Sequence, residues 1–263
     1  MKGLNSIKKN KGEKKIVMLT AYEYLTASYL KDAGVDMILV GDSAGMVFSG
    51  YSNTLPVTVD EIIYHTKAVK RGAGSVPVVS DMPFMSYQAG VRDAKKNAGR
   101  IIKEAGADAV KLEGGSGILK QVRALVEMGI PVMGHIGTQP QSVKKYGGYP
   151  VSGRTEAEKE VLIKDAAALE KAGVFAIVIE KTESGAAKEI TAAVSVPVIG
   201  IGSGPYCDGQ VLVVHDMLGM YDKFTPKFVK KYADLNSEMK KAFKEYIEEV
   251  KSGAFPGPEH SFK

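Results

Sequence analysis

The sequence has little of what marks secreted, disulfide-bonded or membrane-embedded proteins. It contains one cysteine, Cys207, among 263 residues, and no tryptophan. No disulfide can therefore form within the chain, and a reducing compartment such as the cytoplasm is expected. No apolar run approaches the ~18 residues of a membrane-spanning helix, and the N-terminal segment MKGLNSIKKNKGEKK has no apolar stretch of the kind found in secretory signals. We expect a cytoplasmic protein that does not enter a membrane.

Motifs for nucleotide chemistry are also missing. The chain has neither GxxxxGK[ST] nor a strand–GxGxxG–helix unit, so nucleotide hydrolysis and dinucleotide binding are not expected. The segment GIGSGPYCDGQ does follow an apolar run, and its backbone amides could bind an anion. A single glycine-rich loop is weak support for a phosphate site.

The charge and composition are those of a globular protein. Lysine and arginine number 35 against 30 aspartate and glutamate, which gives a formal net charge of +5. The lysines are spread over many segments, without a basic stripe of interleaved aromatic residues, so we expect solvated helix faces and no nucleic acid partner. Hydrophobic residues make up 44% and charged residues 25%, as in folded domains.

The length fits one α/β domain of the (β/α)8 type, which typically has ~250 residues. No linker rich in proline, glycine and serine interrupts the chain, so a single barrel domain over residues 1–263 is predicted. From about Ser237 the helical segment KKAFKEYIEEVK and the irregular SGAFPGPEHSFK predict a C-terminal helical tail. This tail could be a capping arm or an oligomer contact.

Short, mostly apolar runs predict eight strands, and continuous runs of this kind suit a parallel sheet covered on both faces. They are Ile16–Thr20, Met37–Gly41, Val76–Asp81, Ala109–Glu113, Pro131–His135, Phe175–Glu180, Val196–Ile201 and Gln210–His215. Amphipathic segments of helical length lie between them. Two of these begin with a capping box, Thr58 with Glu61 and Thr155 with Glu158. Eight such strand–helix units favour a closed (β/α)8 TIM barrel.

Polar residues gather where these strands end, and barrel active sites lie at the C-terminal strand ends. They are Asp42 with Ser43, Asp81, Lys111 with Glu113, His135, Glu180 and His215 with Asp216. Buried carboxylates need a cation, a catalytic role or hydrogen bonds. Asp42, Asp81 and Glu113 offer oxygen ligands suited to Mg²⁺. Alternatively, these acids cap the helices that follow.

Lys111 and Glu113 are two residues apart on a strand, so both side chains point to the same side. Glu180 ends the apolar run FAIVIE, where burial should raise its pKa and make it a suitable general base. It could instead pair with Lys181 or Lys111. Lys111 could form a Schiff base, although the nearby Glu113 favours a charged lysine that steadies an anion. His135 could be a ligand, an acid or a hydrogen-bonded residue.

Long motifs in this order resemble one known family. They are GDSAGMVFSGYSNTLPVT, HTKAVKRGA, SDMPFMSYQ, NAGRIIKEAGADAVKLEGG, GIPVMGHIG and GIGSGPYCDGQVLVVHDMLG. They resemble the ketopantoate hydroxymethyltransferases, and the likeness runs from near Met18 to the C-terminal FPGPEHSF. The resemblance implies a (β/α)8 barrel of the phosphoenolpyruvate-binding type. It also implies transfer of a hydroxymethyl group from 5,10-methylenetetrahydrofolate to 2-oxoisovalerate (3-methyl-2-oxobutanoate), through a Mg²⁺-stabilised enolate, in pantothenate and coenzyme A biosynthesis.

The resemblance also assigns roles to residues of this chain. It implies one Mg²⁺ per subunit on Asp42, Asp81 and Glu113. It places the keto acid on Asp42, Ser43, Asp81 and Lys111, and makes Glu180 the proton acceptor. The resemblance further implies a cytoplasmic homo-oligomer, commonly a decamer, and leaves the folate-contacting residues unassigned.

Two other functions stay open on the residues alone. A Mg²⁺-dependent lyase, mutase or aldolase of 2-oxo acids would use the same barrel and the same strand-end acids, without folate. A non-catalytic barrel would have no need for acids at so many strand ends, and it would bind neither Mg²⁺ nor a 2-oxo acid.

Overall fold

The computed structural model describes residues 3–222 and 224–262. The chain divides into two compact units, residues 1–213 and residues 214–263. The first unit holds all eight strands, and the second holds the C-terminal helices. The expectation of one domain over the whole chain stays a prediction.

The first unit is a closed barrel of eight parallel strands in sequence order, as predicted. The strands are β1 Ile16–Thr20, β2 Met37–Val40, β3 Val78–Asp81, β4 Ala109–Glu113, β5 Val132–Gly137, β6 Ala176–Glu180, β7 Val198–Ile201 and β8 Gly209–Leu212. The ring closes where β8 pairs with β1, with Ile16 opposite Gly209 and Leu19 opposite Leu212.

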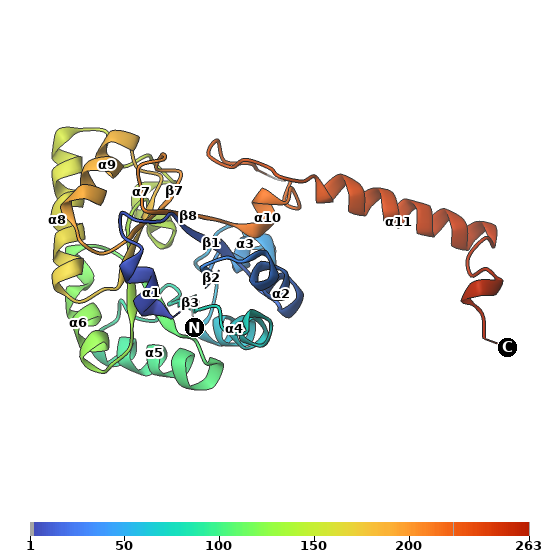
Figure 1. Ribbon diagram of the computed structural model, residues 1–263, viewed down its shortest axis with the longest axis horizontal. Helices are drawn as coiled ribbons and strands as arrows, with labels where there is room; N and C mark the ends of the chain where they lie inside the picture. The colour runs from blue at the N-terminus through green and yellow to red at the C-terminus, as the bar shows by residue number, and fades with distance from the viewer. Residues whose placement is uncertain (1–2, 223, 263) are drawn as a thin grey trace. The chain divides into compact units, whose positions relative to one another are not determined.

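Helices surround this ring (Figure 1). They are α2 Tyr24–Ala33, α3 Ala44–Val47, α4 Val59–Ala73, α5 Val91–Ala105, α6 Leu119–Glu127, α7 Val143–Tyr146, α8 Glu156–Lys171 and α9 Ser184–Ala193, with α1 Leu4–Lys9 preceding β1. Thr58 and Glu61 form the complete capping box predicted for α4. The second predicted box is wrong in one half. The Thr155 hydroxyl accepts from the Glu158 amide, but the Glu158 carboxylate reaches one residue further, to the amide of Arg154.

Two apolar layers result from the alternation of side chains along each strand. One layer lies between the strands and the outer helices and contains Val110 and Leu112 of β4. The other contains Ala109 of the same strand, together with residues of all the other strands, and it fills the barrel interior. Ile7 of α1 packs against this interior layer.

The last predicted strand, Gln210–His215, is partly wrong. β8 ends at Leu212, where its ladder with β1 ends. His215 lies instead in the short helix α10 Val214–Met217, in the second unit. The sequence LVVH is apolar enough to continue a strand, but a strand needs a paired neighbour for its backbone groups. His215 and Asp216 are therefore not strand-end residues of the barrel.

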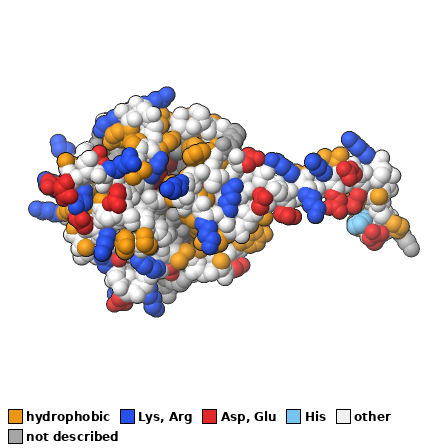
Figure 2. Space-filling model, turned by 90° about the horizontal axis from the view of Figure 1, so that it is seen from above, with side chains coloured by type: hydrophobic (Ala, Val, Ile, Leu, Met, Phe, Trp, Pro, Cys, Tyr) orange, Lys and Arg blue, Asp and Glu red, His pale blue; other side chains and the backbone are white. Residues whose placement is uncertain are grey.

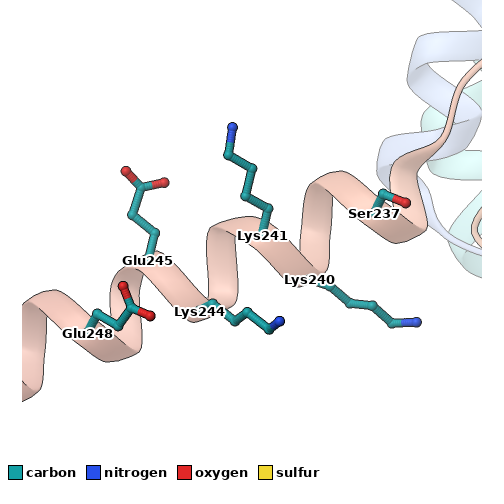
Figure 3. A pocket seen from close by; sticks show the side chains of 6 residues that line it. All are labelled: Ser237, Lys240, Lys241, Lys244, Glu245 and Glu248. Atoms are coloured by element: carbon teal, nitrogen blue, oxygen red, sulfur yellow. The ribbon is translucent and has the colours of Figure 1, made fainter.

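The second unit contains the predicted tail helix as α11 Leu235–Ser252, followed by a 3-10 turn at Pro258–His260. The Asp234 side chain caps α11 by accepting from the amide and hydroxyl of Ser237. Figure 3 shows a hollow on this helix lined by Ser237, Lys240, Lys241, Lys244, Glu245 and Glu248. Because one helix supplies the whole lining, the hollow is an open surface and not an enclosed site.

Charges of both signs are interspersed over the visible face of the molecule, without one large basic patch (Figure 2). None of the helices in the described part of the chain combines the length and the apolar character that a bilayer crossing requires.

Candidate active site

Four neighbouring strands, β3 to β6, present polar side chains to the barrel interior at their C-terminal ends. On each of them an apolar residue of the interior layer is followed two positions later by a polar residue, which must face the same side. The pairs are Val79 and Asp81, Ala109 and Lys111, Met133 and His135, and Val178 and Glu180. Glu113 is two residues beyond Lys111 and continues this face. The structure therefore brings the predicted strand-end residues of these strands together.

Asp42 joins this group from β2. It lies two residues past the end of that strand and is 4% exposed. Its amide donates a hydrogen bond of 2.9 Å to Oδ2 of Asp81. The neighbouring Ser43 begins α3, and its hydroxyl lies 2.8 Å from the Tyr22 hydroxyl. The loop after β2 is thus fastened to the end of β3.

Lys111 and Asp81 form a buried ion pair. The two residues are register partners on β3 and β4, and Nζ lies 2.8 Å from Oδ1. Burial alone lowers the pKa of Lys111, but the carboxylates of Asp81, Glu113 and Asp42 outweigh it and raise the pKa above its ordinary value. The lysine is therefore a fixed positive charge. A Schiff base, which needs the neutral amine, is disfavoured.

His135 lies between Lys111 and Glu180. Its Nδ1 is 3.2 Å from Lys111 Nζ and 3.5 Å from Glu113 Oε1, and its Nε2 is 3.4 Å from Glu180 Oε2. An ammonium group can only donate, so the shorter contact makes Nδ1 an acceptor and leaves the ring hydrogen on Nε2, facing Glu180. His135 thus links the lysine to the acid at the end of β6.

The Glu180 side chain is more exposed to solvent than those of the other acids in the site. Its side chain is 21% exposed, whereas those of Asp81 and Glu113 are each 3% exposed. Burial of the carboxylate raises the pKa of Glu180 to about 7. A carboxylate with a pKa near neutrality, open enough to meet a substrate, can accept a proton from carbon more readily than an ordinary glutamate.

The cap alternative for these acids is wrong. In the described chain the helices that follow them begin at other N-cap residues, namely Ser43, Gly90, Ile118 and Glu183.

The glycine-rich loop after β7 is fastened by Ser203, whose hydroxyl donates to the Ile179 carbonyl and accepts from the Thr182 amide. This loop therefore braces the end of β6.

Two residues of the site were missed by the sequence reasoning, Gln141 and Tyr87. The side-chain Nε2 of Gln141 donates to Oδ2 of Asp42 at 2.9 Å, and the backbone N–H of Gln141 donates to Oε2 of Glu113 at 3.0 Å. The Tyr87 hydroxyl contacts both Gln141 and the backbone of Glu113. An uncharged glutamine and a buried tyrosine carry no pattern that separates them from ordinary core residues.

The residues of the predicted metal set, Asp42, Asp81 and Glu113, are linked by hydrogen bonds through the Asp42 amide and Gln141. Burial and the charges of Asp81 and Glu113 raise the pKa of Asp42 well above its ordinary value, which marks a surplus of negative charge that a cation would relieve. As the side chains stand, however, no group of three or more His, Cys, Asp or Glu residues within 3–222 and 224–262 is arranged to hold a metal ion. Asp81 is turned to Lys111, and the metal set stays a prediction.

A closed (β/α)8 barrel with a fixed ammonium, clustered carboxylates and one near-neutral acid at its strand ends has the features of an enzyme active site. Comparison with known proteins then gives the family. The chain belongs to the ketopantoate hydroxymethyltransferase family, whose profile matches residues 2–258. The predicted family is confirmed.

Curated relatives match over nearly the whole chain. A protein of Moorella thermoacetica named 3-methyl-2-oxobutanoate hydroxymethyltransferase is 58% identical over 255 residues, which cover 97% of this chain and 94% of the relative. Relatives of the same name from Caldicellulosiruptor bescii and Enterococcus faecalis are each 56% identical to this chain. The match covers 97% of this chain and 96% of the C. bescii protein, and 95% of this chain and 90% of the E. faecalis protein.

Solved structures share the fold at low identity. A 2,3-dimethylmalate lyase, described as a PEP mutase/isocitrate lyase superfamily member, has a TM-score of 0.61 at 16% identity, covering 97% of this chain and 89% of its own. A phosphonopyruvate hydrolase in complex with oxalate and Mg²⁺ has a TM-score of 0.62 at 12% identity, covering 98% and 92%. They share the predicted (β/α)8 barrel fold with this chain.

Proposed function

We propose that this chain transfers a hydroxymethyl group from 5,10-methylenetetrahydrofolate to 3-methyl-2-oxobutanoate and so makes ketopantoate for pantothenate and coenzyme A synthesis. The shared name of relatives at 54–58% identity supports the substrate and the reaction. The structural observation that carries the proposal is Glu180, a partly exposed acid with a pKa of about 7, separated from the buried Lys111 by His135. A lyase, mutase or aldolase on the same barrel is not favoured, because those likenesses are at 11–17% identity and show the fold alone.

The balance of the reaction requires one water. The C3–H bond of the keto acid is replaced by a C–C bond to the methylene carbon, and water supplies the hydroxyl oxygen of the product. The two C–N bonds of the carrier become N–H bonds, with one hydrogen from C3 and the other from water. The first demand on the protein is therefore removal of a carbon-bound proton beside a ketone.

The residues of the site would divide this work. Glu180 takes the C3 proton, because it is the acid with both a suitable pKa and access to the pocket. Lys111 holds fixed positive charge close to the oxygens of the anionic keto acid. Asp42, Ser43 and Asp81 lie at the C-terminal ends of β2 and β3, where Asp42 hydrogen-bonds to Asp81, and would orient the substrate. His135 Nε2 lies 3.4 Å from the Glu180 carboxylate and would help to orient it.

One Mg²⁺ per subunit would be held by Asp42, Asp81 and Glu113. Three carboxylates suit a hard divalent cation, and the charges of Asp81 and Glu113 add to burial in raising the pKa of Asp42. The phosphonopyruvate hydrolase of similar fold is described with Mg²⁺ and oxalate, a small dicarboxylate. When bound, the metal would supply Lewis acidity toward the keto oxygen.

The proposal extends to location and assembly. We expect a cytoplasmic homo-oligomer, commonly a decamer in proteins of this kind. The tail helix supports association, since α11 carries a row of exposed apolar side chains at helical spacing. They are Met239, Phe243, Tyr246, Ile247 and Val250. Sedimentation velocity tests this, with a single protomer as the result that contradicts it.

Exchange of the C3 hydrogen tests the proposal most directly. The protein is incubated in D2O with 3-methyl-2-oxobutanoate and Mg²⁺, and loss of the C3 signal is followed by proton NMR, with and without tetrahydrofolate. Enzyme-dependent exchange is expected from the wild type and from Glu160→Gln, a control whose acid is exposed on α8. Glu180→Gln should lose it. Unchanged exchange in Glu180→Gln removes the proposed base, and no exchange by folded wild type removes the substrate.

A further inference from the structure

The side chain of Gln141 is fully engaged in hydrogen bonds inside the site. Its Nε2 donates to Asp42 Oδ2 at 2.9 Å and to the Met82 carbonyl at 2.9 Å. Its Oε1 accepts from the Tyr87 hydroxyl at 2.9 Å and from Gln88 Nε2 at 3.0 Å. With two acceptors on one side and two donors on the other, the amide has one orientation only.

The backbone of the same residue holds a second acid. Gln141 lies in a 3-10 turn, Pro140–Ser142, which directly follows β5. This turn directs the Gln141 amide at Glu113 Oε2, 3.0 Å away. One residue thus fixes a carboxylate from the end of β2 and another from the end of β4.

Tyr87 anchors both ends of this arrangement. Its side chain is 1% exposed, and its hydroxyl accepts from the Glu113 amide at 3.1 Å. The same hydroxyl has two acceptors within 2.9 Å, the Glu113 carbonyl and Gln141 Oε1. Because a phenol carries one hydrogen, it can donate to one of them at a time. Either choice keeps Gln141 and Glu113 at a fixed separation.

In each of the clustered acids, one oxygen is held and the other faces the remaining groups of the site. Asp42 uses Oδ2 toward Gln141, Asp81 uses Oδ2 toward the Asp42 amide, and Glu113 uses Oε2 toward the Gln141 amide. No hydrogen bond among the described residues reaches Asp42 Oδ1. Like charges on Asp42 and Glu113 repel, so without these donors both carboxylates would be free to rotate apart.

We propose that Gln141 is a positioning residue that restrains the Asp42 and Glu113 carboxylates for binding a divalent cation, while the third acid, Asp81, is turned to Lys111 in this structure. The inference rests on the metal set of the proposed function. Gln141 is not itself a ligand, since its side-chain oxygen faces the Tyr87 hydroxyl and accepts a hydrogen bond from Gln88 Nε2. Its effect is exerted through the acids, as is usual for groups that orient metal ligands.

Binding of Mn²⁺ to purified protein without substrate tests this, followed by the electron paramagnetic resonance signal of free Mn²⁺. Gln141→Met keeps the backbone donor and the length of the side chain but removes both bonds to Asp42 and Met82. We expect Mn²⁺ affinity to fall by about 10- to 100-fold, the range typical of groups that orient metal ligands. Gln139→Met is the matched control, since Gln139 lies in the same loop and, among the residues that the structure describes, its side chain hydrogen-bonds to Ser142 alone.

A merely structural role gives a different result. It would lower the unfolding temperature of Gln141→Met equally with and without Mn²⁺, and leave the affinity of the folded protein unchanged. That outcome overturns the inference. If Gln141→Met does not fold, Gln141→Asn replaces it, because the shorter amide cannot keep its contacts with both Asp42 and Tyr87. Equal affinity of Gln141→Asn and wild type likewise overturns the inference.

The proposed function and this inference fail separately. Folded wild type that binds Mn²⁺ but exchanges no C3 hydrogen contradicts the function and leaves the role of Gln141 standing. Wild type that exchanges hydrogen while Gln141→Met binds Mn²⁺ normally contradicts the role of Gln141 alone. Wild type that binds no Mn²⁺ overturns the metal set and the inference together.

Discussion

Replacing Glu180 by glutamine should stabilise the protein at alkaline pH while abolishing exchange. Burial raises the pKa of Glu180 from its ordinary value of 4.5 to about 7. The folded state therefore binds the proton more tightly than the unfolded state does. The stability that this proton provides is complete below pH 4.5 and is lost as pH rises to about 7. Glutamine is neutral at every pH and avoids this loss.

The size of the effect follows from the same values. Each pKa unit corresponds to about 1.4 kcal/mol, so ionisation of the buried acid at pH 8 costs about 3 kcal/mol. At pH 5 the cost is below about 1 kcal/mol, because most of the carboxylate is protonated in the folded state. Glu180→Gln should thus exceed the wild type in free energy of unfolding by about 3 kcal/mol at pH 8, and by much less at pH 5.

Urea unfolding followed by circular dichroism measures this difference. Divalent cations are removed with a chelator and the protomer concentration is held constant, since association shifts apparent stability. Glu160→Gln again serves as the control, with a pH-independent difference from wild type. A Glu180→Gln variant whose advantage is the same at pH 5 and pH 8, or which is less stable at pH 8, would refute the assignment of a buried, costly carboxylate at this position.

Three further outcomes follow from the structure. The rate of C3 exchange should fall about tenfold between pH 8 and pH 6, since protonation of a base with a pKa of about 7 removes it; a flat NMR profile over this range contradicts that. Lys111→Met leaves Asp81 buried without its partner and should lower the free energy of unfolding by about 3 kcal/mol, read from urea titrations at pH 8. Thr58→Ala removes the cap of α4 and should cost about 1 kcal/mol in the same titrations with exchange unchanged, so a loss of exchange would link that cap to the site.

Much of the barrel could be predicted because its determinants are local. Continuous apolar runs mark buried parallel strands, and a polar residue at the end of such a run marks the end of the strand. Lys111 and Glu113 could be placed on one face by their spacing alone, and the interior layer confirms this. The end of β8 could not be found in this way, since it depends on where the neighbouring strand β1 ends.

The interior of the site was less predictable because its contacts are distant in sequence. Gln141 reaches Asp42 across 99 residues and Glu113 across 28. An amide at such a position is indistinguishable from a surface glutamine until the fold brings both carboxylates to it. The ionic residues could be identified as candidate site residues from the sequence, because a charged side chain at the end of an apolar strand is expected to be buried and then needs a partner. Neutral residues such as Gln141 and Tyr87, which hydrogen-bond to these ionic groups, have no comparable signal in the sequence.

The balance of charge explains why these neutral residues matter. Asp42, Asp81, Glu113 and Glu180 face a single ammonium, Lys111, so full ionisation leaves an excess of negative charge. The fold absorbs part of this excess with dipoles, through the amides of Asp42 and Gln141 and the side chain of Gln141. Burial is the main cause of the raised pKa of both Asp42 and Glu180, and the charges of neighbouring carboxylates add to it. The excess negative charge that favours a cation thus lies close to Glu180, the acid with a pKa near neutrality. Cation binding and proton removal therefore depend on the same electrostatic arrangement.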